Sequence, residues 1–148
     1  MEIKLMTETH ELWDAVKVYA AECGWSSGKI LAEDMRSRRF SDWERVAVLL
    51  DEDEICGYCT VIKEEAIPDM PYTPFIGTLY IAESHRGSRL GERMLLTSMD
   101  YLKSLGFDKA YLISDHENLY EKYGFRVVDR RMAPWGREEK VYVREIND

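Results

Sequence analysis

The sequence predicts a mixed α/β fold: a single domain with a mostly antiparallel central sheet and one parallel β-α-β crossover. Three observations lead to this prediction. Segments with strand-like and helix-like spacing of apolar residues alternate along the 148 residues. Two apolar runs have the layout of an antiparallel hairpin, and a long amphipathic pattern separates two further strand-like runs, as in a right-handed crossover. Because no repeat, linker or low-complexity tract interrupts the chain, we expect one domain over residues 1–148.

The N-terminal third predicts one strand followed by two helices. Residues 2–6 alternate polar and apolar side chains, which is typical of a half-buried strand. Thr7 is expected to cap a helix, because acidic residues follow where the helix dipole favours them, and Gly24 is expected to end it. We expect residues 26–28 to break the chain before a shorter helix over residues 29–39.

The next segment predicts an antiparallel hairpin and a loop. Residues 46–50 and 55–62 are apolar runs separated by the acidic turn 51–54. Three prolines fall within residues 66–74, where they exclude regular structure and indicate a loop.

The central part of the chain predicts the parallel crossover. Residues 75–82 have the composition of a strand, and a long amphipathic helix is expected from near Ser88. Gly106 is placed to end this helix, and residues 109–114 form the next strand-like run.

The C-terminal part predicts a short helix and a second hairpin. We expect one to three helical turns within residues 115–123. Two strands are expected over residues 125–129 and 140–146, around a turn at residues 134–136.

Charge and hydropathy exclude several classes of partner. A net charge of −8 repels nucleic acid, and the densest basic cluster, at Arg36, Arg38 and Arg39, is too short to offset that repulsion. An acidic surface suits a cationic ligand such as an amine. No apolar run approaches the roughly 20 residues of a membrane helix, and we expect no secretory segment. We therefore expect a cytoplasmic protein with neither a membrane nor a nucleic-acid partner.

The three cysteines include one C-x-x-C pattern, at Cys56 and Cys59, which makes a thiol redox protein a rival hypothesis. Both cysteines fall in a strand-like run, where they should lie about 10 Å apart and point to opposite faces. A disulfide needs Cα atoms within about 7 Å, so we expect these cysteines to belong to the core. The three histidines lack metal-ligand spacing, and we propose no metal site from the sequence.

The junction between the strand at residues 75–82 and the long helix has the chemistry of a phosphate site. The unpaired N–H groups of a helix N-terminus attract anions. Gly87 and Gly91 let the backbone approach a phosphate closely, and Arg86 and Arg89 add positive charge. Neither a Walker loop nor a G-x-G-x-x-G dinucleotide motif is present, so these residues indicate another kind of pyrophosphate site.

Two motifs resemble landmarks of the GNAT superfamily of N-acetyltransferases. Residues 81–91 resemble its acetyl-CoA signature, [QR]-x-x-G-x-[GA], at a strand-to-helix junction. Residues 118–125 (Asn-Leu-Tyr-Glu-Lys-Tyr-Gly-Phe) resemble its second landmark, Y-E-K-x-G-F. The resemblance covers roughly residues 45–130. It departs from the family pattern at Arg89, which replaces the first glycine of the signature.

The resemblance implies a GNAT-like fold, an activity and a set of site residues. The strand ending at Tyr80 and Ile81 would splay from the strand at residues 109–114, and main-chain groups of Tyr80 and Ile81 would bind the pantetheine arm of acetyl-CoA. Asn118 would reach that arm from the other side. Tyr120 would be the general acid that protonates the departing thiolate, a role that a phenol with a pKa near 10 can fill. The residues that would hold the pyrophosphate are Arg86, Gly87, Ser88, Arg89, Leu90 and Gly91.

The general base is not identified by the sequence. Many members of the superfamily place a Glu on the strand before the signature, about four residues upstream of Ile81, but Gly77 stands there in this chain. Glu64, Glu65 and Asp69 are possible substitutes, although each is also typical of an exposed loop.

The acceptor and the assembly state stay open. The resemblance implies direct transfer of the acetyl group to a primary amine in a ternary complex, with an antibiotic, a polyamine, an amino acid or a protein N-terminus as acceptor. A module that senses acyl-CoA without catalysis is the alternative. The aromatic residues considered for an acceptor pocket, the core or the contact of a homodimer are Tyr72, Phe75, Trp135 and Tyr142.

Overall fold

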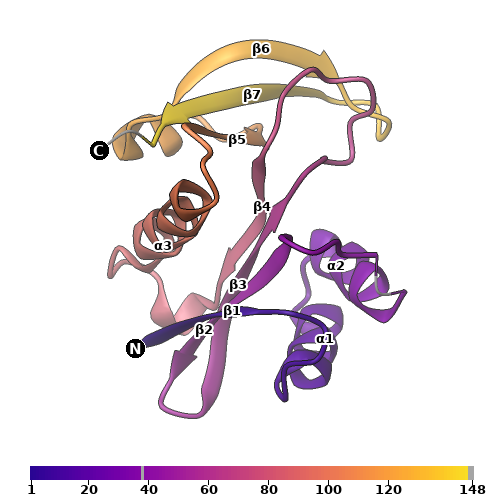
Figure 1. Ribbon diagram of the computed structural model, residues 1–148, viewed down its shortest axis with the longest axis vertical. Coiled ribbons are helices and arrows are strands. Elements are labelled where there is room, and N and C mark those ends of the chain that lie inside the picture. Colours follow the sequence, from indigo (N-terminus) through magenta and orange to yellow (C-terminus); the bar gives the residue numbers. More distant parts are fainter. Residues whose placement is uncertain (38, 147–148) are drawn as a thin grey trace.

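The computed structural model describes residues 1–37 and 39–146. Within these residues the chain forms one seven-stranded sheet in the order β1-β2-β3-β4-β5-β7-β6 (Figure 1). Every neighbouring pair is antiparallel except β4 and β5, which are parallel. The predicted mixed α/β fold is therefore confirmed. The strands are β1 Glu2–Met6, β2 Arg45–Asp51, β3 Glu54–Ile62, β4 Phe75–Ile81, β5 Lys109–Ser114, β6 Arg126–Met132 and β7 Glu138–Glu145.

Helices cover both faces of the sheet. The α-helices are α1 Trp13–Glu22, α2 Ser26–Arg36 and α3 Leu90–Ser104, and two short 3-10 helices are η1 Glu83–His85 and η2 Tyr120–Tyr123. Figure 1 shows α1 and α2 on one side of β1–β4 and α3 on the other. No helix within the described residues is long and apolar enough to cross a membrane.

The strand β2 packs against a hydrophobic core on each face of the sheet. Its apolar run is buried on both faces, so alternate residues enter different clusters. Val46 and Val48 pack with side chains of α1 and α2, whereas Ala47 and Leu49 pack with side chains of α3. The sheet is therefore fixed from both sides where β2, β3 and β4 lie.

The strands β4 and β5 separate soon after they meet. Their only register pair within the described residues joins Phe75 and Tyr111, with one further bond from the Tyr111 N–H to the Pro74 carbonyl, at 2.9 Å. Figure 1 shows β5, β7 and β6 turning away from β1–β4 beyond this point. The splay that the resemblance implies is present, and it opens a gap between the ends of β4 and β5.

The first two helices begin at residues other than those expected. Residues 7–12 form turns, and α1 starts after Leu12 and not at Thr7. The helix α2 starts at Ser26, so residues 26–28 form its first turn and do not break the chain. A side chain at Gly28 would collide with the Ala20 carbonyl and the Tyr58 hydroxyl. This glycine therefore permits close packing of α1 on α2, which local sequence cannot reveal.

Later elements follow the sequence more closely. The strand at residues 109–114 is as predicted. The helix α3 ends at Ser104, and Gly106 follows in the left-handed conformation at φ 95°. The helix starts at Leu90, two residues later than expected. The strands β6 and β7 are longer than predicted at the turn around residues 134–136. Arg38, within the predicted second helix, lies outside the described residues.

The prediction that Cys56 and Cys59 point to opposite faces is wrong. Register pairs join Leu49 with Gly57 and Leu50 with Ile55, so the register shifts by one residue at Cys56. This bulge breaks the alternation of the strand. Both cysteines are buried in the cluster that packs against α3, and both are free thiols.

Candidate active site

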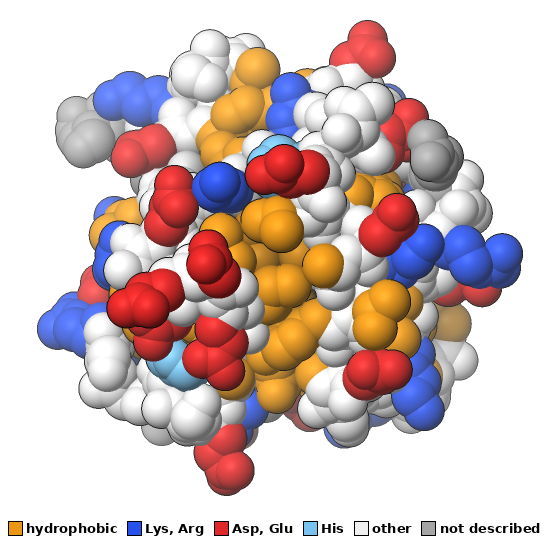
Figure 2. Space-filling view, turned by 90° about the horizontal axis from the view of Figure 1, so that it is seen from below, with side chains coloured by type: hydrophobic (Ala, Val, Ile, Leu, Met, Phe, Trp, Pro, Cys, Tyr) orange, Lys and Arg blue, Asp and Glu red, His pale blue; other side chains and the backbone are white. Residues whose placement is uncertain are grey.

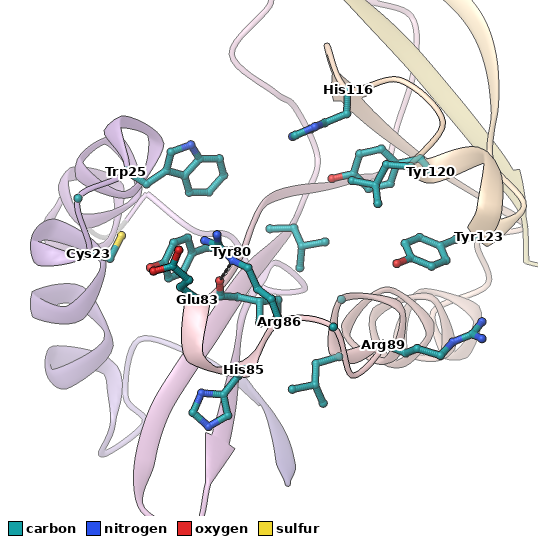
Figure 3. Close-up of a pocket in the computed structure, with 17 residues that line it drawn as sticks. Cys23, Trp25, Tyr80, Glu83, His85, Arg86, Arg89, His116, Tyr120 and Tyr123 are labelled. Carbon is teal, nitrogen blue, oxygen red and sulfur yellow. Dashed lines mark hydrogen bonds between the residues drawn. The ribbon is translucent and has the colours of Figure 1, made fainter.

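A cavity of about 850 Å³ lies where β4 and β5 diverge. Figure 3 shows Trp25 and Tyr80 on one side of the opening and Tyr120 and Tyr123 on the other. Its walls come from the α1–α2 connection, the end of β4, the turn before α3, and the segment around η2. The lining residues are Cys23, Gly24, Trp25, Leu79, Tyr80, Ile81, Glu83, His85, Arg86, Gly87, Arg89, Leu90, Gly91, His116, Leu119, Tyr120 and Tyr123.

The turn before α3 presents an exposed backbone to this cavity. Gly87 adopts a left-handed conformation at φ 89°, and a side chain there would meet no atom within 4 Å. At Gly91 an added Cβ would meet only the Leu79 Cδ2 atom, at 3.7 Å. The N–H of Arg93 donates to the carbonyl of the cap residue Arg89, and no side chain in the described part of the chain caps the helix. The N–H groups of the first turn are thus available to an anion.

Arg89 keeps the shape of the turn without glycine. Its backbone is left-handed, at φ 60° and ψ 25°, which for a residue with a side chain costs about 1–2 kcal/mol. The side chain is 75% exposed, and its Nε donates to the Glu92 Oε1 atom at 2.7 Å. Figure 3 shows Arg89 extending along α3, away from Tyr80. Arg89 therefore contributes the left-handed backbone of the turn that lines the cavity, while its side-chain charge is paired with Glu92.

Arg86 lies closer to the strand end. Its Nε donates to the Ile81 carbonyl at 2.8 Å, and its guanidinium carbon lies 5.7 Å from the centre of the Tyr80 ring. The guanidinium is thereby held beside the main chain to which the GNAT resemblance gives the pantetheine arm. Positive charge and strand backbone are adjacent at this point of the cavity.

Tyr120 places a buried phenol in the opposite wall. Its ring contacts the rings of Tyr142, Phe125 and His116, with centroid distances of 5.7, 6.3 and 6.4 Å. Figure 3 shows the hydroxyl directed into the cavity. Burial, with a smaller contribution from Cys59, raises the pKa of Tyr120 to about 12. The phenol consequently keeps its proton at neutral pH and can donate a hydrogen bond.

The cavity gathers eight of the ten site residues that the sequence analysis named. They are Tyr80, Ile81, Arg86, Gly87, Arg89, Leu90, Gly91 and Tyr120. Ser88 and Asn118 do not line it, and both are exposed. Asn118 adopts a left-handed backbone at φ 61° just before η2.

No sequence pattern indicated the aromatic wall on the α1–α2 side of the cavity. The rings of Trp25 and Tyr80 stack at 5.8 Å, and those of Tyr80 and Tyr58 stack at 5.4 Å. Trp25 follows Gly24 in the connection between the two helices, a position without periodic signal. Glu83 and His116 also line the cavity.

The aromatic residues considered for an acceptor pocket lie elsewhere. Phe75 and Tyr142 are buried in the core. Tyr72 donates to Asp129 at 2.8 Å, and the Trp135 indole donates to Glu139 at 3.0 Å. None of the four lines the cavity. The structure therefore bears out the core alternative for Phe75 and Tyr142, and it places Tyr72 and Trp135 away from this cavity.

His85 at the cavity edge is held by an acidic turn. Its Nε2 lies 3.0 Å from the Asp51 Oδ2, and its Nδ1 lies 2.9 Å from the Ser84 hydroxyl. Ligand atoms of Asp51, Glu54 and His85 lie within 4.8 Å of one another, a spacing that would also suit a cation. The histidine spacing in the sequence did not indicate this cluster, because the hairpin turn and η1 meet only in the fold.

The buried thiols are poorly suited to redox chemistry. Burial raises the pKa of Cys56, and burial raises that of Cys59 to about 11. A reactive cysteine instead needs a stabilised, accessible thiolate. Neither sulfur lines the cavity.

Comparison with known proteins identifies the family. Residues 9–125 match the model of the acetyltransferase (GNAT) family. The chain belongs to this family. Curated protein sequences provide no match.

Solved structures of GNAT proteins share the fold. An aminoglycoside 6'-N-acetyltransferase from Enterococcus faecium is 19% identical, with a TM-score of 0.74 over 100% of this chain and 98% of that chain. An aminoglycoside 6'-N-acetyltransferase complexed with coenzyme A is 18% identical, with a TM-score of 0.73 over 100% and 98%. A GNAT acetyltransferase from Elizabethkingia anophelis with acetyl-CoA bound is 16% identical, with a TM-score of 0.69 over 97% of each chain.

Proposed function

We propose that this GNAT protein transfers the acetyl group of acetyl-CoA to a primary amine by direct attack within a ternary complex. The observation that carries the proposal is the cavity itself. It joins the open N-terminal turn of α3, the unpaired end of β4 and the Tyr120 hydroxyl. The helix turn suits a polyanion, the end of β4 suits an extended thioester arm, and the Tyr120 hydroxyl can donate a proton to the leaving group.

The residues fit coenzyme A chemically. The pyrophosphate would bind the first-turn N–H groups from Gly87 to Gly91, where the backbone is open and no side chain caps the helix. Arg86 adds positive charge at the same end. The extended arm would follow the end of β4 at Tyr80 and Ile81, because β5 leaves this edge unpaired. Acetyl-CoA supplies an acyl thioester, which an amine nucleophile can attack.

The side chains and backbone of the site would lower the barrier in two ways. N–H groups at the end of β4 would stabilise negative charge on the carbonyl oxygen as the amine attacks. Tyr120 would donate its phenolic proton to the departing sulfur. Since its pKa of about 12 lies above that of an ordinary thiol, the phenol would recover a proton at the end of the cycle. The new amide nitrogen releases a proton that can serve this purpose.

The acceptor would approach from the aromatic side. The exposed Trp25 offers an aromatic ring, and Glu83 also lines the cavity, a combination that favours a cationic amine. The net charge of −8 favours the same class. Figure 2 shows acidic side chains beside a band of hydrophobic ones on one face. Two of the similar structures are aminoglycoside N-acetyltransferases, which supports an amine acceptor.

The direct test measures free thiol release. The purified protein is mixed with acetyl-CoA and, in turn, an aminoglycoside, a polyamine, an amino acid and a short peptide with a free N-terminus. We expect at least one amine to accelerate thiol release, with a stoichiometric acetylated product by mass spectrometry. Binding of acetyl-CoA without thiol release for any amine would instead support the sensor alternative.

A further inference from the structure

One buried carboxylate has no role in the chemistry described above. Glu65 lies in the loop of residues 63–74 that connects β3 to β4. Its Oε1 atom is buried and accepts no hydrogen bond from residues 1–37 or 39–146. Among the described residues, the Oε2 atom receives only a long bond, of 3.4 Å, from the Ala66 N–H. An uncompensated carboxylate oxygen in this position costs stability, which calls for a functional reason.

The carboxylate of Glu65 occupies the space that a side chain at Gly77 would fill. A Cβ built on Gly77 would collide with Glu65 Oε1 and would lie 3.0 Å from the Thr60 hydroxyl oxygen. Gly77 and Thr60 are register partners in β4 and β3. The absence of a side chain at Gly77 is thus what allows a loop carboxylate to lie directly on β4.

A bulge in β4 places Gly77 and Tyr80 on the same face of the sheet. Thr60 pairs with Gly77 and Tyr58 pairs with Tyr80, so one extra residue of β4 lies between the two pairs. Thr78, at φ 47°, absorbs the bulge. Because Thr60 and Tyr58 are two residues apart on β3, they share one face and lie about 7 Å apart.

Glu65 therefore lies on the same face as the Tyr80 ring. That ring stacks on Tyr58 and lines the cavity on the α1–α2 side, where the acceptor would enter. One water molecule bridging a carboxylate and an ammonium group spans two hydrogen bonds of about 2.8 Å each. Glu65 itself does not line the cavity, so an acceptor bound there would reach its carboxylate through such a bridge.

We propose that Glu65 is the general base that removes a proton from the acceptor amine, acting through one water from the position that Gly77 leaves open. The inference rests on the proposed acetyl transfer. In this step one ammonium N–H bond breaks, its electron pair becomes the nitrogen lone pair, and the proton passes along the water to the Glu65 carboxylate. Glu65 later returns that proton to solvent.

The electrostatic surroundings of Glu65 support this role. Burial raises its pKa to about 7, the Ala66 N–H lowers it, Asp34 raises it and Arg39 lowers it. Asp34 and Arg39 lie near the C-terminal end of α2 and pair with each other at 3.3 Å. A base that titrates near neutral pH combines a large ionised fraction with a strong tendency to take a proton.

The test compares the pH dependence of kcat/KM for wild type and Glu65→Gln with the best amine of the panel. Glu64→Gln is the matched control, because Glu64 is an exposed neighbour in the same loop. We expect Glu65→Gln to lower kcat about 100-fold or more, as for loss of a general base, and to abolish the rise of kcat/KM centred near pH 7. The acetyl-CoA Kd should stay unchanged, and Glu64→Gln should behave as wild type.

A relocation variant separates catalysis from folding. Gly77→Glu combined with Glu65→Ala moves a carboxylate onto β4 into the space vacated by Glu65. Its kcat/KM should be at least tenfold higher than that of Glu65→Ala alone. The rise of kcat/KM near neutral pH should also return. An active wild type whose pH profile is unchanged in Glu65→Gln would overturn the role of Glu65 alone. A wild type that acetylates no amine of the panel would overturn the proposed function as well.

Discussion

The raised pKa of Glu65 leads to a quantitative prediction about the free energy of unfolding, which does not depend on any acceptor. Its pKa of about 7 in the folded chain lies above its ordinary value of 4.5. Between these two pH values the native state holds a proton that the unfolded state has already lost. Stability must therefore fall as the pH rises through this window. The folded and unfolded pKa values differ by about 2.5, and each pKa unit is worth about 1.36 kcal/mol. The free energy of unfolding should therefore be about 3 kcal/mol lower by pH 8.

The substitution Glu65→Gln removes this titration and should reveal it. We expect the free energy of unfolding of wild type, relative to Glu65→Gln, to fall by about 3 kcal/mol between pH 4.5 and pH 8. Urea unfolding at several pH values measures the difference, and Glu64→Gln should parallel wild type throughout. Parallel curves for wild type and Glu65→Gln would refute the claim that the carboxylate is buried and uncompensated.

Three further predictions concern the cavity and the cysteines. Tyr120→Phe should lower kcat about 100-fold or more while the acetyl-CoA Kd measured by calorimetry stays within a factor of about 2, since only the proton donor is lost; an unchanged kcat would exclude the acid role. Arg89→Gly should leave that Kd within a factor of about 3, because the side chain is paired with Glu92 and the glycine keeps the left-handed turn; a loss above tenfold would show that the guanidinium binds phosphate. The double change Cys56→Ser and Cys59→Ser should lower the melting temperature, because two hydroxyls enter the core, but leave the kcat of the folded fraction intact; loss of kcat in folded protein would revive the redox hypothesis.

The sequence predicted the parts of the fold that depend on local pattern. The crossover from β4 through α3 to β5 followed from apolar periodicity, since each element carries its own signal. The turn proposed to bind pyrophosphate could be named for the same reason: Arg86, Gly87 and Gly91 are close in sequence and line one cavity. Even Arg89, which departs from the signature, keeps the left-handed backbone that the turn requires.

What the sequence could not predict depends on contacts between distant segments. The role of Gly28 is set by its contact with α1 and Tyr58, so it was misinterpreted as a break in the chain. The position of Cys56 depends on a bulge relative to β2. Glu65 could be named as a possible base but not chosen, because its proximity to Gly77 arises only when the loop folds onto β4.

Titration calorimetry of the protein with acetyl-CoA tests most directly whether the open turn of α3 and the unpaired end of β4 form a cosubstrate site. We predict one site per chain, with an affinity that weakens as salt is added, because the pyrophosphate is held by N–H groups and by Arg86. Absence of any heat at millimolar acetyl-CoA, at low salt and with folded protein, would contradict it.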